Sequence, residues 1–233
     1  MKIEGAISVK AAIQASKREV IEVYIDSSNT SKNFNYIRKI AKEKNISIKE
    51  INREEFNNFN PGKTFGGIMA EVSLRKEDNF NDGDIFYICG IEDPFNLGYI
   101  IRNLYAFGIT NLILDKRDYS SFESQLLKSS AGAYDFINIK YTDNADLLIK
   151  DYKNKGYKTY ALNRGEDSKD VFNTTFHKPS LVVIGGEKRG INAKVLETID
   201  EKLFIPYATD FRNSLNASNA LACVATLLFK QRK

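Results

Sequence analysis

The sequence has no tryptophan, one histidine and two cysteines among 233 residues. The lone His177 makes histidine-based acid–base chemistry or a histidine metal centre improbable. Cys89 and Cys223 both lie in apolar surroundings, so they predict neither a disulfide framework nor a zinc site. No run approaches the roughly 18 apolar residues of a membrane span, and the first residues contain no apolar leader core. We therefore expect a metal-free, soluble, cytoplasmic protein.

Charge of either sign is also modest. The formal net charge is +4, and lysine and arginine are spread along the chain without long runs. This distribution allows an anionic partner such as nucleic acid without requiring one. The kind of molecule that the protein binds must therefore be inferred from its sequence motifs.

The first third of the chain alternates helical and strand-like patterns. Helices are predicted at 8–15 and 31–44, and strands at 20–25, 46–51 and 66–72. The charged, turn-rich stretch 75–84 then predicts a linker. We expect a small α/β domain over 1–79 and a larger domain over 80–233.

The larger domain shows a stronger alternation. Strands are predicted at 85–90, 109–115, 136–139, 157–162, 181–185 and 203–206, with helical stretches between most of them. This order predicts an α/β fold with a mainly parallel sheet and helices on both faces. Because such sheets bind ligands at the carboxyl ends of their strands, the loops after Gly90, Ile184 and Pro206 are the candidate site.

The first of these loops reads GIEDPFNLGYIIRNLYAFGI. Pro94 and Asn96 fit a turn, and Gly98 is predicted to start a helix. Asn96 and Arg102 would lie near its first turns, where the helix dipole does not favour a cation, so Arg102 is more easily explained by a ligand. A solvated arginine with an ordinary carboxylate partner is the alternative.

The second loop, GGEKRGI, lacks the order of a dinucleotide or Walker glycine loop. It could be a tight turn that needs positive φ at Gly185, Gly186 or Gly190. Glu187 could face a ligand or be solvated beside its basic neighbours.

The third loop carries Ser214 and Asn216 just before the apolar stretch LNASNALACVATLLF, which predicts a buried helix. Both residues are good helix caps, and Ser214 is placed to cap this one.

In their order, DPFNLGYIIRNLYAFG, IGGEKRGI and IPYATDFRNSLNASNA resemble the three motifs of the SpoU (TrmH-like) RNA 2′-O-ribose methyltransferases of the SPOUT superfamily. The resemblance covers residues 85–230. The N-terminal part, from EGAISVKAAIQ to FGGIMAEVSLR, is similar to the small substrate-binding domain that many members carry. The sequence departs mildly from the family pattern at three positions: Ala217 replaces a usual valine, Asn219 stands where an apolar residue is commoner, and Gly186 occupies a variable small position.

The resemblance implies a C-terminal trefoil knot, S-adenosylmethionine as cofactor, a homodimer and an RNA substrate, with ribosomal RNA favoured over transfer RNA. The matching motifs imply a catalytic centre of Asn96, Arg102, Glu187, Ser214 and Asn216. They imply cofactor contacts from Gly185, Gly190, Ile205, Pro206 and Leu215, largely through backbone groups.

The chemistry mainly requires that the ribose oxygen, methyl group and sulfur be held in line. Since a guanidinium group is effectively always protonated, Arg102 is a better phosphate clamp than a base. A catalytically silent RNA-binding protein on the same scaffold is the principal alternative. A Rossmann-type nucleotide enzyme ranks last, because IEDPFNLG replaces the expected glycine-rich turn.

Overall fold

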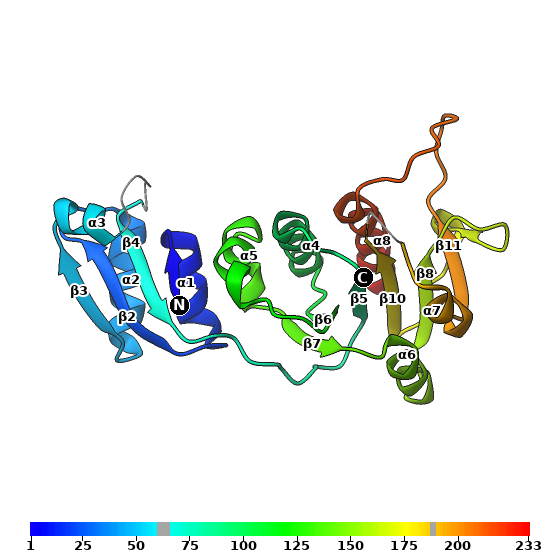
Figure 1. Ribbon diagram of the computed structural model, residues 1–233, viewed down its shortest axis with the longest axis horizontal. Coiled ribbons are helices and arrows are strands. Elements are labelled where there is room, and N and C mark those ends of the chain that lie inside the picture. The colour runs from blue at the N-terminus through cyan, green and yellow to red at the C-terminus, as the bar shows by residue number, and fades with distance from the viewer. Residues whose placement is uncertain (60–65, 187–189) are drawn as a thin grey trace. The chain divides into compact units, whose positions relative to one another are not determined.

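The structure is a computed structural model that describes residues 1–59, 66–186 and 190–233 (Figure 1). The chain forms two compact units, each made from separate stretches of sequence. Unit 1 contains residues 1–76 and 119–136, and unit 2 contains residues 77–118 and 137–233. The helices and strands of each unit are described separately below.

Unit 1 has a four-stranded mixed sheet in the order β1-β4-β2-β3. Strand β3 is parallel to β2, whereas β4 is antiparallel to both β1 and β2. Its N-terminal elements are β1 (Lys2–Glu4), α1 (Ala6–Ala15), β2 (Val20–Asp26), α2 (Lys32–Glu43), β3 (Ser47–Ile51), α3 (Arg53–Phe59) and β4 (Ile68–Val72). The predicted helices and strands are all present, and the short β1 and α3 are additions that the pattern did not indicate.

The second stretch of unit 1 carries η1 (Ser120–Phe122), α5 (Glu123–Ser129) and η2 (Ala133–Asp135). Helix α5 packs against β1 and α1. A Cβ atom on Gly132 would lie 2.7 Å from that of Ala11, so the two stretches are in close contact. Residues far beyond the expected boundary near 80 thus pack with the N-terminal elements.

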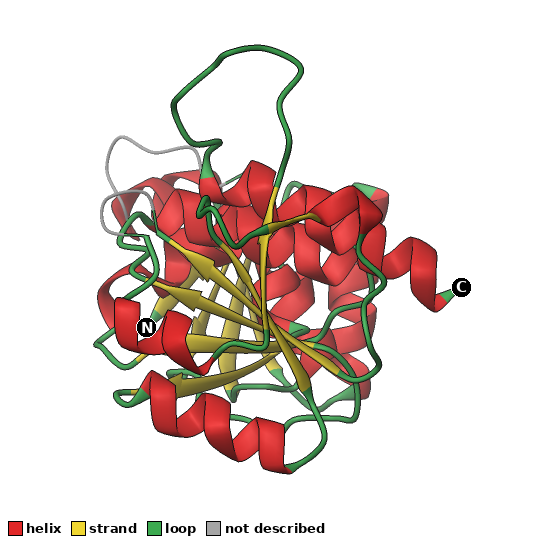
Figure 2. Ribbon diagram, turned by 90° about the vertical axis from the view of Figure 1, so that its right-hand side faces the viewer, coloured by secondary structure: helices red, strands yellow, loops and turns green. Residues whose placement is uncertain are grey.

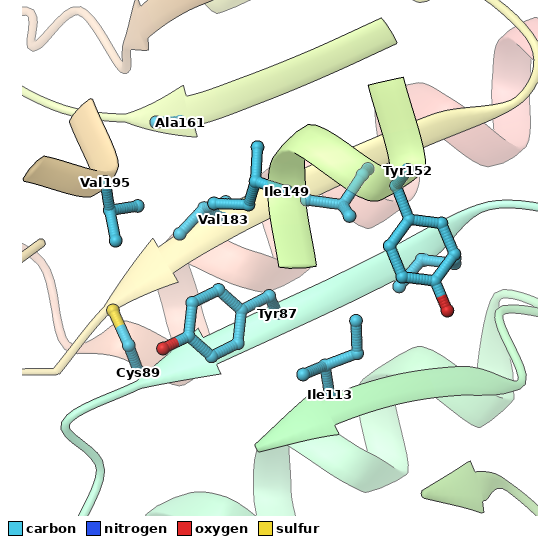
Figure 3. Close-up of a cluster of buried hydrophobic side chains, with 10 residues drawn as sticks. Tyr87, Cys89, Ile113, Ile149, Tyr152, Ala161, Val183 and Val195 are labelled. Atoms are coloured by element: carbon cyan, nitrogen blue, oxygen red, sulfur yellow. The ribbon is translucent and has the colours of Figure 1, made fainter. Parts of the chain in front are cut away.

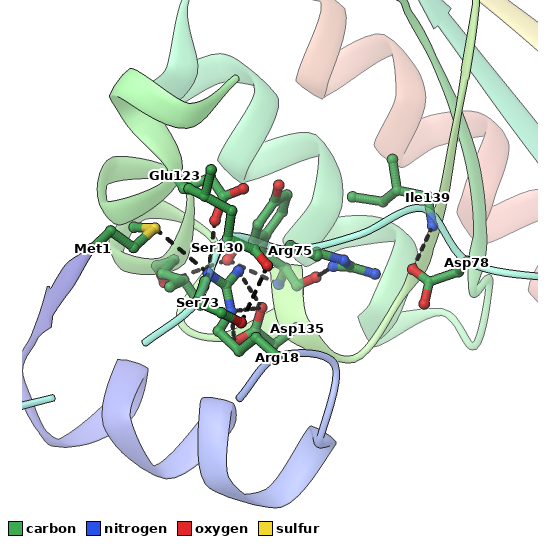
Figure 4. Close-up of polar contacts among 12 residues, drawn as sticks. Met1, Arg18, Ser73, Arg75, Asp78, Glu123, Ser130, Asp135 and Ile139 are labelled. Atoms are coloured by element: carbon green, nitrogen blue, oxygen red, sulfur yellow. Dashed lines mark hydrogen bonds and ion pairs between the residues drawn. The ribbon is translucent and has the colours of Figure 1, made fainter. Parts of the chain in front are cut away.

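A buried arginine joins the two stretches of unit 1 (Figure 4). Arg18 is only 7% exposed, and its guanidinium donates to Glu123 Oε2 at 2.6 Å and to Asp135 Oδ1 at 2.8 Å. Burial opposes its charge, but the two carboxylates outweigh that effect and raise the Arg18 pKa. One cation is therefore shared by two carboxylates from the other stretch.

Unit 2 contains a seven-stranded sheet among the described residues, in the order β7-β6-β5-β10-β8-β11-β9. Every recorded strand pair in it is parallel. Its elements are β5 (Ile85–Cys89), α4 (Pro94–Ala106), β6 (Asn111–Asp115), β7 (Asn138–Thr142), α6 (Ala145–Asn154), β8 (Lys158–Leu162), β9 (Lys169–Asp170), η3 (Val171–Asn173), β10 (Ser180–Gly185), α7 (Ala193–Thr198), β11 (Glu201–Phe204) and α8 (Ala217–Arg232).

Both faces of this sheet are buried, as the apolar strand patterns predict. Tyr87, Ile113 and Val183 pack with Ile149 of α6 and Val195 of α7 on one face (Figure 3). The alternate residues Phe86, Val182 and Ile184 are also buried, and they point to the opposite face. Helix α8 contacts β10 and packs along α4. Figure 2 shows helices on both sides of the strands.

Three local predictions need correction. Helix α4 begins at Pro94, not at Gly98, because Asp93 caps it and proline is favoured in the first helical turn. Strand β7 begins two residues later than expected and extends to Thr142. Strand β9 was not expected, since it has only two residues.

None of the described helices is long and apolar enough to cross a membrane. Within the same residues, no group of three or more histidine, cysteine, aspartate or glutamate side chains could hold a metal ion.

We predict that Arg18→Met lowers the free energy of unfolding by about 3–5 kcal/mol, because it leaves two buried carboxylates without their cation. Urea unfolding followed by circular dichroism measures this loss. Lys39→Met is the control, since Lys39 and Glu43 form an exposed ion pair whose removal costs less than about 1 kcal/mol. Equal effects of the two substitutions would contradict the role given to Arg18.

Candidate functional site

The candidate site begins where the central strands β5 and β10 end side by side. Gly185 lies opposite Cys89 in the parallel register, and the Gly186 N–H donates to the Cys89 carbonyl at 2.7 Å. Gly190, where the described chain resumes, donates its N–H to the Gly186 carbonyl at 3.1 Å. Two backbone loops therefore meet at the carboxyl edge of the sheet.

This close approach requires glycine for steric reasons. A Cβ atom on Gly185 would lie 2.5 Å from the Gly190 carbonyl carbon, and one on Gly186 would overlap the Gly90 carbonyl oxygen. Among Gly185, Gly186 and Gly190, the backbone φ angle is positive at Gly190, where it is 62°. Gly185 and Gly186 are thus needed for space, and Gly190 for its backbone conformation.

Asp115, at the end of β6, fixes the start of the first loop. Its carboxylate accepts from the Tyr87 hydroxyl and from the Gly90 N–H, each at 2.6 Å. The neighbouring Cys89 is buried, and desolvation, with a smaller effect of the Asp115 charge, raises its pKa to about 12. Cys89 is therefore a neutral thiol and not a nucleophile at neutral pH.

Asn96 and Asn216, which are 120 residues apart in the sequence, are brought together by the fold. Asn96 lies in the first turn of α4, where its N–H donates to the capping carboxylate of Asp93. Asn216 Nδ2 donates to Asn96 Oδ1 at 3.3 Å. This contact joins the first turn of α4 to the start of α8.

Asn216, and not Ser214, caps helix α8. Its Oδ1 accepts from the N–H and from the hydroxyl of Ser218, at 2.9 and 2.7 Å. The expectation that Ser214 caps the helix is wrong, because α8 begins at Ala217 and leaves Ser214 in the preceding loop. Ser214 is exposed there and faces a cavity.

That cavity has a volume of about 320 Å³ and opens at the carboxyl ends of β8, β10 and β11. Its wall is formed by residues at the ends of these three strands, by residues of the loops that follow them, and by the first residues of α8. They are Leu162, Asn163, Arg164, Ile184, Gly185, Gly186, Gly190, Ile191, Leu203, Phe204, Ile205, Tyr207, Ser214, Leu215, Ala217 and Ala220. The wall combines backbone groups with aliphatic side chains, as small-molecule sites commonly do.

The structure distributes the predicted site residues as follows. Gly185, Gly190, Ile205, Leu215 and Ser214 line the cavity, whereas Pro206 is absent from the lining. Asn96 and Asn216 form the contact described above. Arg102 is exposed on α4 and makes no hydrogen bond or ion pair with a described residue. Glu187 lies outside the described residues.

The sequence interpretation missed one wall of the cavity. Leu162, Asn163 and Arg164 follow β8, a strand whose loop was not among the three selected. Applying the strand-end rule to every predicted strand would have included this loop. Tyr207 was also missed, although it is next to Pro206 in the third motif.

Two family models match the chain. The SpoU rRNA methylase model matches residues 85–226, and the model for RNA 2′-O-ribose methyltransferase substrate binding matches residues 2–77.

Several curated relatives match over nearly their full length. The chain is 25% identical over 228 residues to a 23S rRNA (guanosine-2′-O-)-methyltransferase RlmB of Vibrio parahaemolyticus, covering 94% of this chain and 92% of the relative. It is 29% identical over 241 residues to an uncharacterized tRNA/rRNA methyltransferase of Archaeoglobus fulgidus, covering all of both chains.

Solved structures show the same fold. The SpoU methyltransferase AviRb of Streptomyces viridochromogenes, solved with AdoMet, gives a TM-score of 0.80 at 19% identity over 100% of this chain and 90% of that one. An RNA methyltransferase of the TrmH family from Porphyromonas gingivalis gives a TM-score of 0.79 at 21% identity. The match covers 97% of this chain and 87% of that one. With the family model matched over more than half of its length, the chain belongs to the SpoU rRNA methylase family.

Proposed function

We propose that the protein transfers a methyl group from S-adenosylmethionine to a ribose 2′-hydroxyl of structured RNA. The observation that carries this proposal is the glycine-walled cavity at the ends of β8, β10 and β11, with the Asn96–Asn216 contact formed by the same sequence motifs. Family membership supports it independently.

The cavity has the properties that this cofactor needs. Its volume of about 320 Å³ lies within the range of small-molecule sites. Ile184, Ile205 and Leu215 offer an apolar surface for a nucleobase, and the Gly185 and Gly190 backbones leave room for close polar contacts. When bound, S-adenosylmethionine supplies an electrophilic methyl group on its sulfonium sulfur.

The protein residues mainly position the RNA. Asn96 and Ser214 orient the ribose, and Asn216 fixes Asn96 through the 3.3 Å hydrogen bond. Arg102 holds the phosphate of the target nucleotide through paired, charge-assisted hydrogen bonds. The hydroxyl proton leaves late, to phosphate or water, and Glu187 organises the loop after β10. We further propose that this C-terminal segment forms a trefoil knot.

We propose different roles for the two parts of the chain. Residues 1–79 provide the RNA-binding surface, and residues 80–233 contain the methyltransferase site together with the stretch 119–136 that packs with the N-terminal elements. Ribosomal RNA is favoured over transfer RNA, because a full-length relative is named a 23S rRNA (guanosine-2′-O-)-methyltransferase. The protein works in the cytoplasm, where its two free cysteines would stay reduced.

A second copy of the chain covers the outer face of α4. Phe95 and Tyr99 on this helix are 51% and 47% exposed, and Phe229 of the adjacent α8 is also exposed. Arg102 lies on the same side of α4, seven residues after Phe95. Homodimer formation would bury these rings and place Arg102 beside the interface.

The central test combines cofactor binding with a map of RNA methylation. Calorimetric titration with S-adenosylmethionine should show one site per chain. A deletion strain should lose ribose methylation at one position of its RNA, and the purified protein should restore it. Cofactor binding without any methylation difference would contradict the proposed reaction, and absence of both would favour a silent RNA-binding protein.

Arg102→Lys should lower kcat/KM for RNA by about 10- to 100-fold, because lysine keeps the charge but loses the paired hydrogen bonds. Steady-state transfer of tritiated methyl groups measures this change. The Kd for S-adenosylmethionine, measured by calorimetry, should stay within about twofold. Near wild-type turnover would contradict the phosphate clamp.

Tyr99→Glu should convert the dimer to a monomer, because it places a charge in the centre of the proposed interface. Light scattering after size-exclusion chromatography gives the mass. Leu147→Glu is the matched control, since Leu147 is an exposed apolar residue on α6. A monomeric wild-type protein would disprove the proposed dimer.

A further inference from the structure

Three side chains form an aromatic and basic group at the mouth of the cavity. We call Arg164, Tyr207 and Phe211 the rim cluster. Arg164 comes from the loop after β8, whereas Tyr207 and Phe211 come from the long loop between β11 and α8. This loop extends beyond the strand ends of unit 2 (Figures 1 and 2). Arg164 and Tyr207 line the cavity, and Phe211 does not.

Arg164 is held in place although its side chain is exposed. Its guanidinium carbon lies 4.0 Å from the centre of the Tyr207 ring, a close cation–π contact. Its Nη1 donates to the carbonyls of Arg212 and Asn213, at 3.1 and 3.4 Å. The guanidinium is therefore pre-positioned against an aromatic ring while part of it remains open to solvent.

Tyr207 connects this pair to the cavity wall. Its hydroxyl accepts from the Leu215 N–H at 3.0 Å, eight residues further along the loop. Leu215 and Tyr207 both line the cavity. The base of the long loop is thus fixed from both sides, which keeps the Arg164–Tyr207 stack at the cavity mouth.

Phe211 adds a second, more exposed ring. It is 50% exposed, and its ring centre lies 5.8 Å from that of Tyr207 with the planes tilted by 40°. Because it is not in the cavity lining, a role in holding the cofactor does not explain it. A single exposed phenylalanine is unremarkable, but this one stands beside a stacked arginine at a proposed RNA site.

We propose that the rim cluster is a stacking platform for an RNA base next to the methylated nucleotide. Aromatic rings and arginine guanidinium planes are the surfaces on which proteins stack unpaired bases. Arg164 and Arg212 place positive charge beside the rings, but Asp210 in the same loop as Arg212, and Glu166 and Asp167 in the loop of Arg164, oppose it. The proposal therefore rests on stacking and not on net charge. This inference rests on the proposed RNA substrate and assigns residues that contact the base.

The test measures binding of two fluorescein-labelled probes to the full-length protein by anisotropy. One is a single-stranded oligoadenylate of twelve nucleotides, and the other is an abasic ribose-phosphate chain of equal length. Phe211→Ala should weaken oligoadenylate binding about tenfold, within the range for loss of one stacked base. It should change the Kd for the abasic chain less than about twofold, because that chain has no base to stack.

Matched variants identify the interaction. Phe211→Tyr keeps an aromatic face and should bind oligoadenylate like the wild type. Arg164→Lys keeps a donor for the loop carbonyls but loses the guanidinium plane, so it should weaken oligoadenylate binding. Phe172→Ala is the control, since Phe172 is 53% exposed in the same unit and lies outside the cavity lining. It should bind both probes normally.

Four results would overturn the proposal. The first is that the wild-type protein does not bind oligoadenylate, and the second is that Phe211→Ala weakens binding of both probes equally. The third is that Phe211→Ala binds S-adenosylmethionine more weakly than the wild type, and the fourth is that this variant no longer has the mass of a dimer. The third would make Phe211 a lid over the cofactor, and the fourth would make it a contact between copies. Base-dependent binding without methyl transfer would support the platform and contradict the proposed reaction, so the two failures are distinguishable.

Discussion

The site depends on the close approach of glycine backbones at the ends of β5 and β10. A Cβ atom on Gly186 would overlap the Gly90 carbonyl of the neighbouring loop, and one on Gly185 would overlap Gly190 of its own loop, so this packing requires glycine at both positions. The Gly186–Cys89 hydrogen bond fixes this close approach, and Asp115 fixes the start of the neighbouring loop through Gly90. The cavity wall, α4 and the start of α8 are all placed relative to this close approach.

Much of this arrangement could be predicted from the sequence. Apolar strand patterns such as IFYIC and LVVIG require burial on both faces, and the alternation with helices then requires a parallel sheet. The order of the strands within the sheet is harder to predict from the sequence. Even so, the rule that ligands bind at strand ends was enough to select loops that contain Gly185, Ile205 and Leu215, all of which line the cavity.

The missed features depend on contacts between residues distant in sequence. Nothing local to Asn96 indicates a hydrogen bond to Asn216, and nothing in the loop after β8 indicates that Arg164 will stack on Tyr207. The start of α8 shows a different limit of prediction from sequence. Both Ser214 and Asn216 have the chemistry of a cap, and only the actual first turn decides which of them accepts the Ser218 N–H.

The interleaved makeup of unit 1 has a consequence for how the chain can be divided. Residues 119–136 lie within the stretch matched by the methylase model, yet they pack with residues 1–76. Cutting the chain near residue 80 would therefore not release two intact halves. The C-terminal piece would keep Glu123 and Asp135 but lose Arg18, together with the helix that covers Gly132.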